Sequence, residues 1–152
     1  MMDDTTTPTA PAGLRQLRAA VESMRTGDQV GIGGLLGMTA DTVDEGTVTF
    51  TLSTRPDFSN PLGIVHGGIA ATMLDSAMGC AVHTTLGEGE GYSTVDLHVH
   101  YTRPIPLDLG EIRATGTVVH RGRRIATAEG KVHDADGRLL AHATTTCLVM
   151  GA

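Results

Sequence analysis

The segment from Asn60 to Gly68 combines residue types that can polarise a carbonyl group. It reads Asn-Pro-Leu-Gly-Ile-Val-His-Gly-Gly and leads into residues 66–86, a stretch dense in Ala, Met and Leu. A helix beginning there leaves the N–H groups of Gly67 and Gly68 free at the positive end of its dipole. Neither glycine has a Cβ, so a ligand oxygen can reach these donors; Asn60 adds an amide donor, and His66 can orient the loop or the ligand. A glycine-rich helix cap with a structural histidine fits the same pattern equally well.

Asp75 places a carboxylate in the middle of this otherwise apolar stretch. A buried carboxylate is costly unless it is paired or takes part in chemistry. Ala71 and Gly79, one helical turn before and after it, are small and leave room for a ligand beside the carboxylate. We therefore favour a functional carboxylate, and the alternative is an aspartate that hydrogen-bonds a neighbouring strand.

The spacing between His66 and Asp75 predicts that they do not act together within one subunit. They are nine residues apart, which at about 100° per residue places them on opposite sides of a helix. If both are catalytic, the active site must combine Asn60 and Gly67 of one subunit with Asp75 of another. The sequence therefore predicts an active site at a dimer interface.

The apolar pattern along the chain predicts the elements that position these residues. Alternating residues indicate strands, and denser apolar spacing indicates helices. The Gly-rich stretch 31–34 is expected to end the first helix, and residues 54–65 form a loop before the second one. Asp136-Gly137 is a strong hairpin signal. The expected order is a helix at 13–25, strands at 35–43 and 47–53 joined by a turn at 44–46, a buried helix at 66–86, and strands near 92–103, 110–120, 124–133 and 138–150.

This order predicts an α+β fold in which one antiparallel sheet wraps around a central helix. Such a sheet buries one face on the helix and leaves the other face in water. One unit leaves a sheet edge unpaired, so we expect two units to pair as a dimer. Residues 1–12 are expected to be a flexible tail, and residues 13–152 a single domain.

Composition narrows the classes of function. The net charge of −6 argues against nucleic acid as a partner, since phosphate binding needs a basic field. Cys80 and Cys147 are too few and too far apart for a disulfide framework or a zinc motif, which favours two buried thiols in a reducing compartment. Residues 1–12 lack the features of a secretory signal, and residues 67–81 are too short to span a membrane. A cytoplasmic protein is expected.

Three motifs resemble the PaaI-like hotdog-fold acyl-CoA thioesterases. The first is Asn-Pro-x-Gly-x-x-His-Gly-Gly, followed by Ala-Ala-Thr-Met-Leu-Asp at 70–75. The second is Thr-Val-Asp-Leu-His-Val-His-Tyr-Thr-Arg-Pro at 94–104, which is similar to the third-strand motif of that family. The third is His-Arg-Gly-Arg-Arg at 120–124, similar to the turn between two later strands. The resemblance covers roughly residues 35–150.

The resemblance implies a hotdog fold, a homodimer that often pairs into a homotetramer, and hydrolysis of acyl-CoA without metal or other cofactor. By position, the Gly67 amide and Asn60 would polarise the thioester carbonyl, and His66 would orient the thioester. Asp75 would act as general base or nucleophile, and Thr94 would hold the attacking water. The acyl group is expected to be small or aromatic. We expect its pocket to be lined by Met73, Met78 and Val82.

The coenzyme A part of the substrate carries phosphates, which arginine recognises well. Arg121, Arg123 and Arg124 form the most basic cluster of the chain, and we expect them to bind these phosphates. A solvated turn is the alternative. The full set of expected substrate contacts is Gly68, Arg103, Arg121, Gly122, Arg123 and Arg124.

Two other functions compete with hydrolysis. Asp96, His98 and His100 share one face of the predicted strand, and His-x-His is a metal-ligand spacing, so a cupin-like metal protein is one rival. No acidic residue follows His100 before Asp108, which weakens this alternative. The other rival is a hotdog protein that binds acyl-CoA without hydrolysing it, or that acts as a hydratase.

Overall fold

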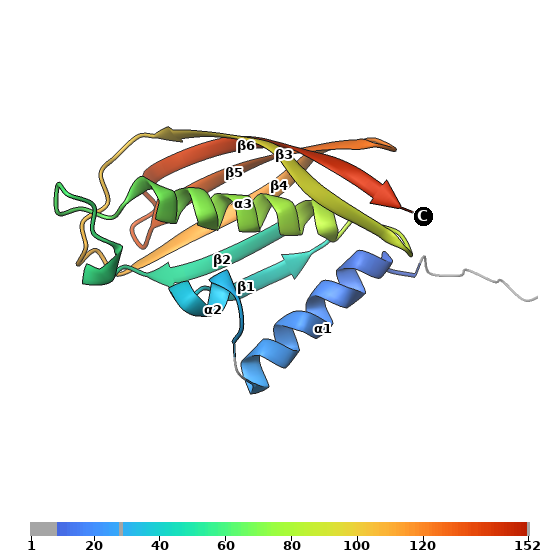
Figure 1. Ribbon diagram of the computed structural model, residues 1–152, viewed down its shortest axis with the longest axis horizontal. Helices are drawn as coiled ribbons and strands as arrows, with labels where there is room; N and C mark the ends of the chain where they lie inside the picture. The colour runs from blue at the N-terminus through green and yellow to red at the C-terminus, as the bar shows by residue number, and fades with distance from the viewer. Residues whose placement is uncertain (1–8, 28, 152) are drawn as a thin grey trace, which may run out of the picture.

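A single antiparallel sheet curves over one long helix in the computed structural model, which describes residues 9–27 and 29–151 (Figure 1). The strand order is β1-β2-β4-β5-β6-β3, as expected for a hotdog fold. The helices are α1 (Ala12–Thr26), α2 (Ile32–Leu36) and α3 (Gly67–His83), with a short 3-10 turn η1 (Pro56–Phe58). The strands are β1 (Thr39–Asp44), β2 (Thr47–Ser53), β3 (Glu90–Tyr101), β4 (Glu111–Arg121), β5 (Ile125–Asp134) and β6 (Leu139–Gly151).

Helix α3 lies directly against the sheet because two strand glycines let it approach. A Cβ on Gly116 of β4 would lie 2.4 Å from the backbone of Ala77 in α3. A Cβ on Gly130 of β5 would lie 3.0 Å from the side chains of Leu74 and Met78. These α3 residues are fully buried, so the helix is fixed along most of its length.

A β-bulge in β3 separates Thr94 from the residues that follow it. Thr94 pairs with Cys147 and Asp96 pairs with Thr146, so Val95 is an extra residue on the β3 side. An extra residue reverses which face later side chains take. Thr94 therefore faces α3, whereas the exposed His98 and His100 lie on the outer face of the sheet. The bulge explains how Thr94 faces the helix although it alternates in sequence with Asp96, His98 and His100.

Strand β3 is also an unpaired edge of the sheet. Most of its residues are exposed, including the apolar Val95 and Tyr101 at 62% and 53%. Natural proteins usually cover or charge such an edge, because its free N–H and C=O groups pair readily with another strand. This edge has the properties of a pairing surface.

The predicted strand at 35–43 is wrong at its beginning. Leu35 and Leu36 belong to α2, and Gly37 ends that helix with a φ of 75°, a conformation that favours glycine. The Gly-rich stretch is thus not merely the end of α1, which stops at Thr26. A short apolar run between glycines does not distinguish strand from helix by its period. The other predicted strands agree with the structure to within about two residues.

Helix α1 is attached mainly at its beginning. The Gly13 N–H donates to the Leu86 carbonyl at 3.0 Å, and both Ala12 and Leu14 are buried. Beyond Leu14 the residues of α1 are half-buried or exposed, and Figure 1 shows the helix running away from the end of α3. Residues 1–8 of the expected tail lie outside the described residues, whereas Ala12 already belongs to α1.

Candidate active site

Asn60 organises the loop before α3. Its Oδ1 accepts hydrogen bonds from the N–H groups of Leu62 at 2.9 Å and Ile64 at 3.3 Å. Asn60 Oδ1 therefore accepts hydrogen bonds within the loop, and the N–H groups of Asn60 Nδ2 are the ones that could donate to a ligand. Asn60, Gly67 and Arg103 line one hollow of about 210 Å³. The structure thus brings together three of the residues singled out in the sequence.

His66 caps helix α3 with its side chain. Its Nδ1 accepts the Gly68 N–H at 2.8 Å, so the imidazole carries its proton on Nε2 and can donate from there. The Gly68 N–H is therefore already used and is not a free donor for a substrate. The Gly67 N–H has no acceptor among the described residues. Of the two amides considered from the sequence, Gly67 is the one available to a carbonyl oxygen.

Tyr101 fixes the position of Gly67, a role that the sequence did not reveal. Its hydroxyl donates to the Gly67 carbonyl at 2.7 Å. A Cβ on Gly67 would lie 3.0 Å from the tyrosine ring, so the contact requires glycine. Partial burial raises the pKa of Tyr101, which keeps the hydroxyl protonated as a donor. The signal was present in the sequence, because Tyr101 lies within the third-strand motif.

Asp75 and Thr94 form the second part of the site. The Thr94 hydroxyl donates to Asp75 Oδ1 at 2.9 Å, which joins the middle of α3 to the edge strand β3. Asp75 is half-buried, so its carboxylate is within reach of solvent and of a ligand. The threonine oxygen keeps its lone pairs for a water molecule next to the carboxylate. This arrangement suits a carboxylate that activates water.

The groups around Asp75 are uncharged. Burial and the neighbouring Asp75 charge raise the pKa of the Cys80 thiol to about 11. Burial also raises the pKa of Tyr92. The Tyr92 ring covers Gly79, where a Cβ would lie 2.7 Å from the tyrosine hydroxyl oxygen. Tyr92 therefore fills the space beside Gly79, so the room expected for a ligand next to the carboxylate does not lie on the Gly79 side.

One subunit does not bring the two parts together. Gly67 and Asp75 are eight residues apart on α3, which corresponds to about 12 Å along the helix axis. The hollow beside Gly67 contains neither Asp75 nor Thr94. Within one chain the helix cap at Gly67 and the carboxylate at Asp75 are therefore separate.

The arginine cluster divides into one fixed side chain and two exposed ones. Arg121 forms an ion pair with Glu90 at 2.6 Å and a hydrogen bond with Thr85 at 3.1 Å. The Gly87 N–H and then Arg121 hold the pKa of Glu90 below its usual value, so this pair stays charged. Arg123 and Arg124 are exposed and line a hollow of about 530 Å³ next to the end of β6. Only these two present free guanidinium edges to a ligand.

The histidines of the outer sheet face stack on one another. His98 and His100 lie 5.0 Å apart between ring centres, and His142 of β6 lies 4.9 Å from His100. Within residues 9–27 and 29–151, no group of three or more His, Cys, Asp and Glu side chains is arranged to hold a metal ion. In the same residues, no helix is long and apolar enough to cross a bilayer.

Comparison with known proteins gives the family. Residues 62–141 match the model of the thioesterase superfamily. A putative esterase of Halobacterium salinarum is 33% identical over 67% of this chain and 69% of its own length. The medium/long-chain acyl-CoA thioesterase YigI of Escherichia coli is 33% identical over 57% of this chain, and the match spans 63% of YigI.

A solved structure agrees with this result. A putative thioesterase of Ralstonia eutropha, described as a phenylacetic acid degradation-related protein, superposes with a TM-score of 0.72 at 31% identity. The superposition covers 84% of this chain and 98% of the other. These matches confirm the resemblance to PaaI-like proteins and the expected fold. The chain therefore belongs to the thioesterase superfamily and is a thioester hydrolase with the hotdog fold.

Proposed function

We propose that the protein hydrolyses the thioester of a small or aromatic acyl-CoA to the free acid and coenzyme A. The observation that carries this proposal is the hydrogen bond from Thr94 to Asp75, because it holds a carboxylate and a water-binding hydroxyl side by side at a solvent-accessible point. The name of the relative YigI supports acyl-CoA as the substrate class.

The reaction follows from the two parts of the site. Asp75 takes a proton from the water beside Thr94, and the water oxygen attacks the thioester carbon. The negative charge that develops on the carbonyl oxygen is stabilised by the Gly67 N–H and the Asn60 amide. When this intermediate collapses, the C–S bond breaks and coenzyme A leaves as a thiolate, which then takes up a proton. Direct attack by the Asp75 carboxylate would use the same position.

A dimer through β3 would complete the site. If two β3 strands pair antiparallel about an axis between Leu97 and His98, Thr94 of one subunit lies opposite Tyr101 of the other. Because Thr94 contacts Asp75 and Tyr101 contacts Gly67, this register would bring the carboxylate of one subunit to the helix cap of the other. Pairing would also cover the exposed edge.

The dimer has a direct test. Leu97→Asp in both subunits places two carboxylates at the proposed axis, so we expect a monomer by light scattering and loss of activity. The matched variant Leu35→Asp, at an exposed leucine of α2, controls for the introduced charge. A Leu97→Asp protein that stays dimeric and active would rule out this register. A homotetramer built from two dimers, and a cytoplasmic location, remain predictions.

Coenzyme A recognition would fall to exposed arginines. Arg123 and Arg124 at the β4–β5 turn suit its phosphates, and Arg103 lies in the hollow beside Gly67. Arg121 with Gly122 would instead shape the turn, since Arg121 is already paired with Glu90.

A thiol-release assay tests the function itself. Purified protein is incubated with acetyl-, hexanoyl-, phenylacetyl- and palmitoyl-CoA while free thiol is followed with a chromogenic disulfide. We expect turnover that is unaffected by a metal chelator. Tight acyl-CoA binding without thiol release would instead identify a binding protein, and consumption of an enoyl-CoA without thiol release would identify a hydratase.

A further inference from the structure

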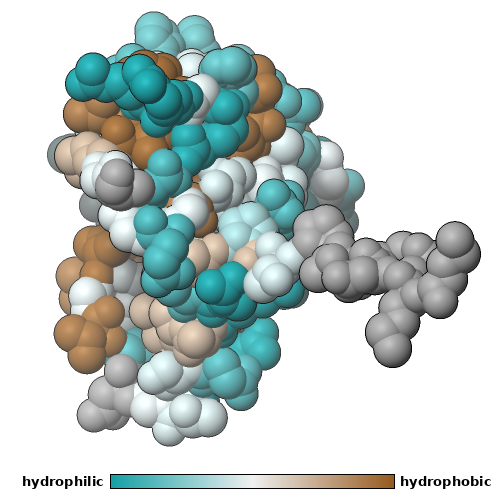
Figure 2. Space-filling view, turned by 90° about the vertical axis from the view of Figure 1, so that its right-hand side faces the viewer, coloured by the Kyte–Doolittle hydropathy of each residue, from teal (hydrophilic) through white to brown (hydrophobic). Residues whose placement is uncertain are grey.

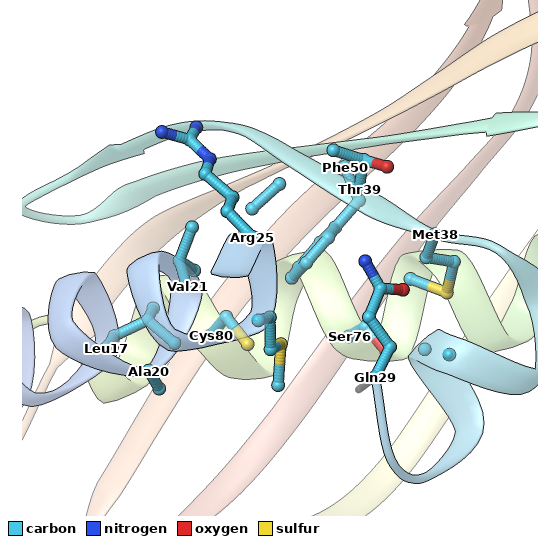
Figure 3. Close-up of a pocket in the computed structure, with 14 residues that line it drawn as sticks. Leu17, Ala20, Val21, Arg25, Gln29, Met38, Thr39, Phe50, Ser76 and Cys80 are labelled. Atoms are coloured by element: carbon cyan, nitrogen blue, oxygen red, sulfur yellow. The ribbon is translucent and has the colours of Figure 1, made fainter. Parts of the chain in front are cut away.

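A third cavity, of about 160 Å³, lies on the side of α3 that faces α1. It is enclosed by α1, by the α2–β1 connection, and by the face of α3 that carries Ser76 and Cys80. Figure 3 shows Leu17 and Val21 of α1 at the left of this space, with Cys80 of α3 beside them and Met38 at the right. No part of the proposed reaction uses this cavity.

The cavity wall is apolar. Leu17, Val21 and Met24 of α1 recur at helical spacing along it, and Phe50 of β2 closes it from above in Figure 3. The one charged side chain among its described lining residues is Arg25, which is exposed and pairs with Glu22 at 3.6 Å. A wall of this kind favours an uncharged, water-insoluble group.

The cavity lies within one helical turn of the proposed reacting carboxylate, although Asp75 itself is not a lining residue. Ser76, which lines the cavity, follows Asp75 directly in α3, and Cys80 lies one helical turn beyond Ser76. The Asp75 charge is also close enough to Cys80 to add to the rise of the thiol pKa. The cavity is thus the apolar space closest along α3 to a carbonyl carbon that Asp75 would hold. Met73, Met78 and Val82, expected to line the acyl pocket, are instead fully buried and do not line this cavity.

The outer half of α1 is held weakly. Its first turn is fixed by the Gly13–Leu86 hydrogen bond, and Arg18 bonds the Val43 carbonyl at 3.0 Å. Further along, Met24 is 47% exposed, although it lines the cavity. Exposed apolar residues continue past α1 at Val30 and Ile32. Figure 2 shows a brown apolar area low on the molecule, at the level of this corner.

We propose that this cavity binds the acyl group of the substrate and that α1 is the wall that sets acyl-chain preference, with Leu17, Val21 and Met24 as the determining residues. This inference rests on the proposed function and deepens it. A dry cavity of about 150 Å³ is large enough for benzene, so the pocket takes an acyl group of about six carbons, aromatic or straight. Acetyl groups leave it empty.

Each methylene that enters the cavity stabilises the bound state by about 0.8 kcal/mol, which is about a fourfold gain in kcat/KM. We expect kcat/KM to rise by more than tenfold from acetyl-CoA to hexanoyl-CoA. Val21→Phe fills part of the cavity and should reduce the ratio of hexanoyl to acetyl kcat/KM by about tenfold or more. The matched variant Ala19→Phe adds the same ring on an exposed part of α1 outside the cavity lining and should leave the ratio unchanged.

Labelling of Cys80 gives a readout that does not depend on turnover. A small thiol reagent is applied with and without the hexyl thioether of coenzyme A, which cannot be hydrolysed, and modification is located by peptide mass spectrometry. We expect the hexyl thioether to protect Cys80, while the ethyl thioether and coenzyme A do not. The buried Cys147 serves as the internal reference.

The outcomes separate the two proposals. Absence of thiol release from every acyl-CoA overturns the proposed function, whatever Cys80 does. Turnover with a hexanoyl-to-acetyl ratio that Val21→Phe does not change, together with equal labelling of Cys80 under both thioethers, overturns the acyl pocket alone. If Val21→Phe does not fold, the labelling experiment on the unaltered protein still decides the pocket.

Discussion

The two ends of the proposed catalytic part of α3 are built in different ways. At Gly67 the proposed carbonyl donor is a backbone N–H, and neighbours close in sequence position it: His66 caps the helix and Asn60 shapes the loop. At Asp75 the proposed base is a side chain, and Thr94 holds it from a distant strand. The first part depends on local geometry and the second on the tertiary fold. Substitutions should therefore affect them differently.

The largest effect is expected at the carboxylate. Asp75→Asn keeps the shape of the side chain but removes the base, so kcat should fall about 10³-fold, within the range of general-base catalysis. Asp108→Asn, the same change in an exposed loop residue, is the control. The measurement is the steady-state kcat of the folded variant. An Asp75→Asn enzyme with a kcat within tenfold of that of the unaltered enzyme would contradict the assignment of Asp75 as the base.

The next largest effect is expected at the helix cap. Gly67→Ala brings a methyl group to about 3 Å from the Tyr101 ring, which displaces the tyrosine and narrows access to the N–H group. Loss of one oxyanion donor costs about 10²–10³ in kcat. Gly91→Ala, where a Cβ meets nothing within 4 Å, is the matched control. If only KM changed, Gly67 would contribute to binding and not to the transition state.

A smaller effect is expected where the fold supports the carboxylate. Thr94→Val removes the hydroxyl and keeps the shape, so we expect kcat to fall about 10–100-fold, the equivalent of about 1.5–3 kcal/mol for a hydrogen bond to a charged group. Thr94→Ser should restore most of the activity because it retains the hydroxyl. Equal losses in both variants would show that packing, and not the hydrogen bond, is what matters at this position.

The smallest effect on activity is expected at the exposed arginines, which lie away from both Gly67 and Asp75. Arg123→Glu with Arg124→Glu should raise KM for acyl-CoA about tenfold with kcat little changed, and the effect should weaken with added salt. Arg113→Glu reverses the charge of a half-buried arginine that pairs with Asp41 and Glu111, and it is the comparison variant. An unchanged KM would show that Arg123 and Arg124 do not bind coenzyme A.

The sequence predicted the local part of the site better than the tertiary part. The cap at Gly67 and the hairpins follow from short-range rules, and the bounds of the five strands after β1 agree to within about two residues. The carboxylate was recognisable because it interrupts an apolar helix. The surroundings of the carboxylate were not recognisable: Tyr92 fills the space over Gly79. Met73, Met78 and Val82, which were expected to line the acyl pocket, are fully buried and do not line the cavity proposed here for the acyl group.

These failures have physical reasons. The bulge at Val95 adds one residue to β3 and decides which face of the sheet Thr94 takes. The amino-acid sequence of β3 does not predict this bulge. The helical turn at Leu35–Leu36 depends on Gly37 adopting a positive φ, which an apolar run alone does not specify. Contacts between distant elements, such as Arg121 with Glu90, follow from the sheet order and not from spacing.

Complementation between inactive subunits tests the central claim most directly. Asp75→Ala and Asn60→Ala chains are given different affinity tags, and the heterodimer is purified and assayed beside each homodimer. If the site is shared between subunits, one of the two sites in each heterodimer is intact, so its specific activity should be about half that of the unaltered dimer, while both homodimers stay inactive. A heterodimer no more active than the homodimers would contradict a shared site.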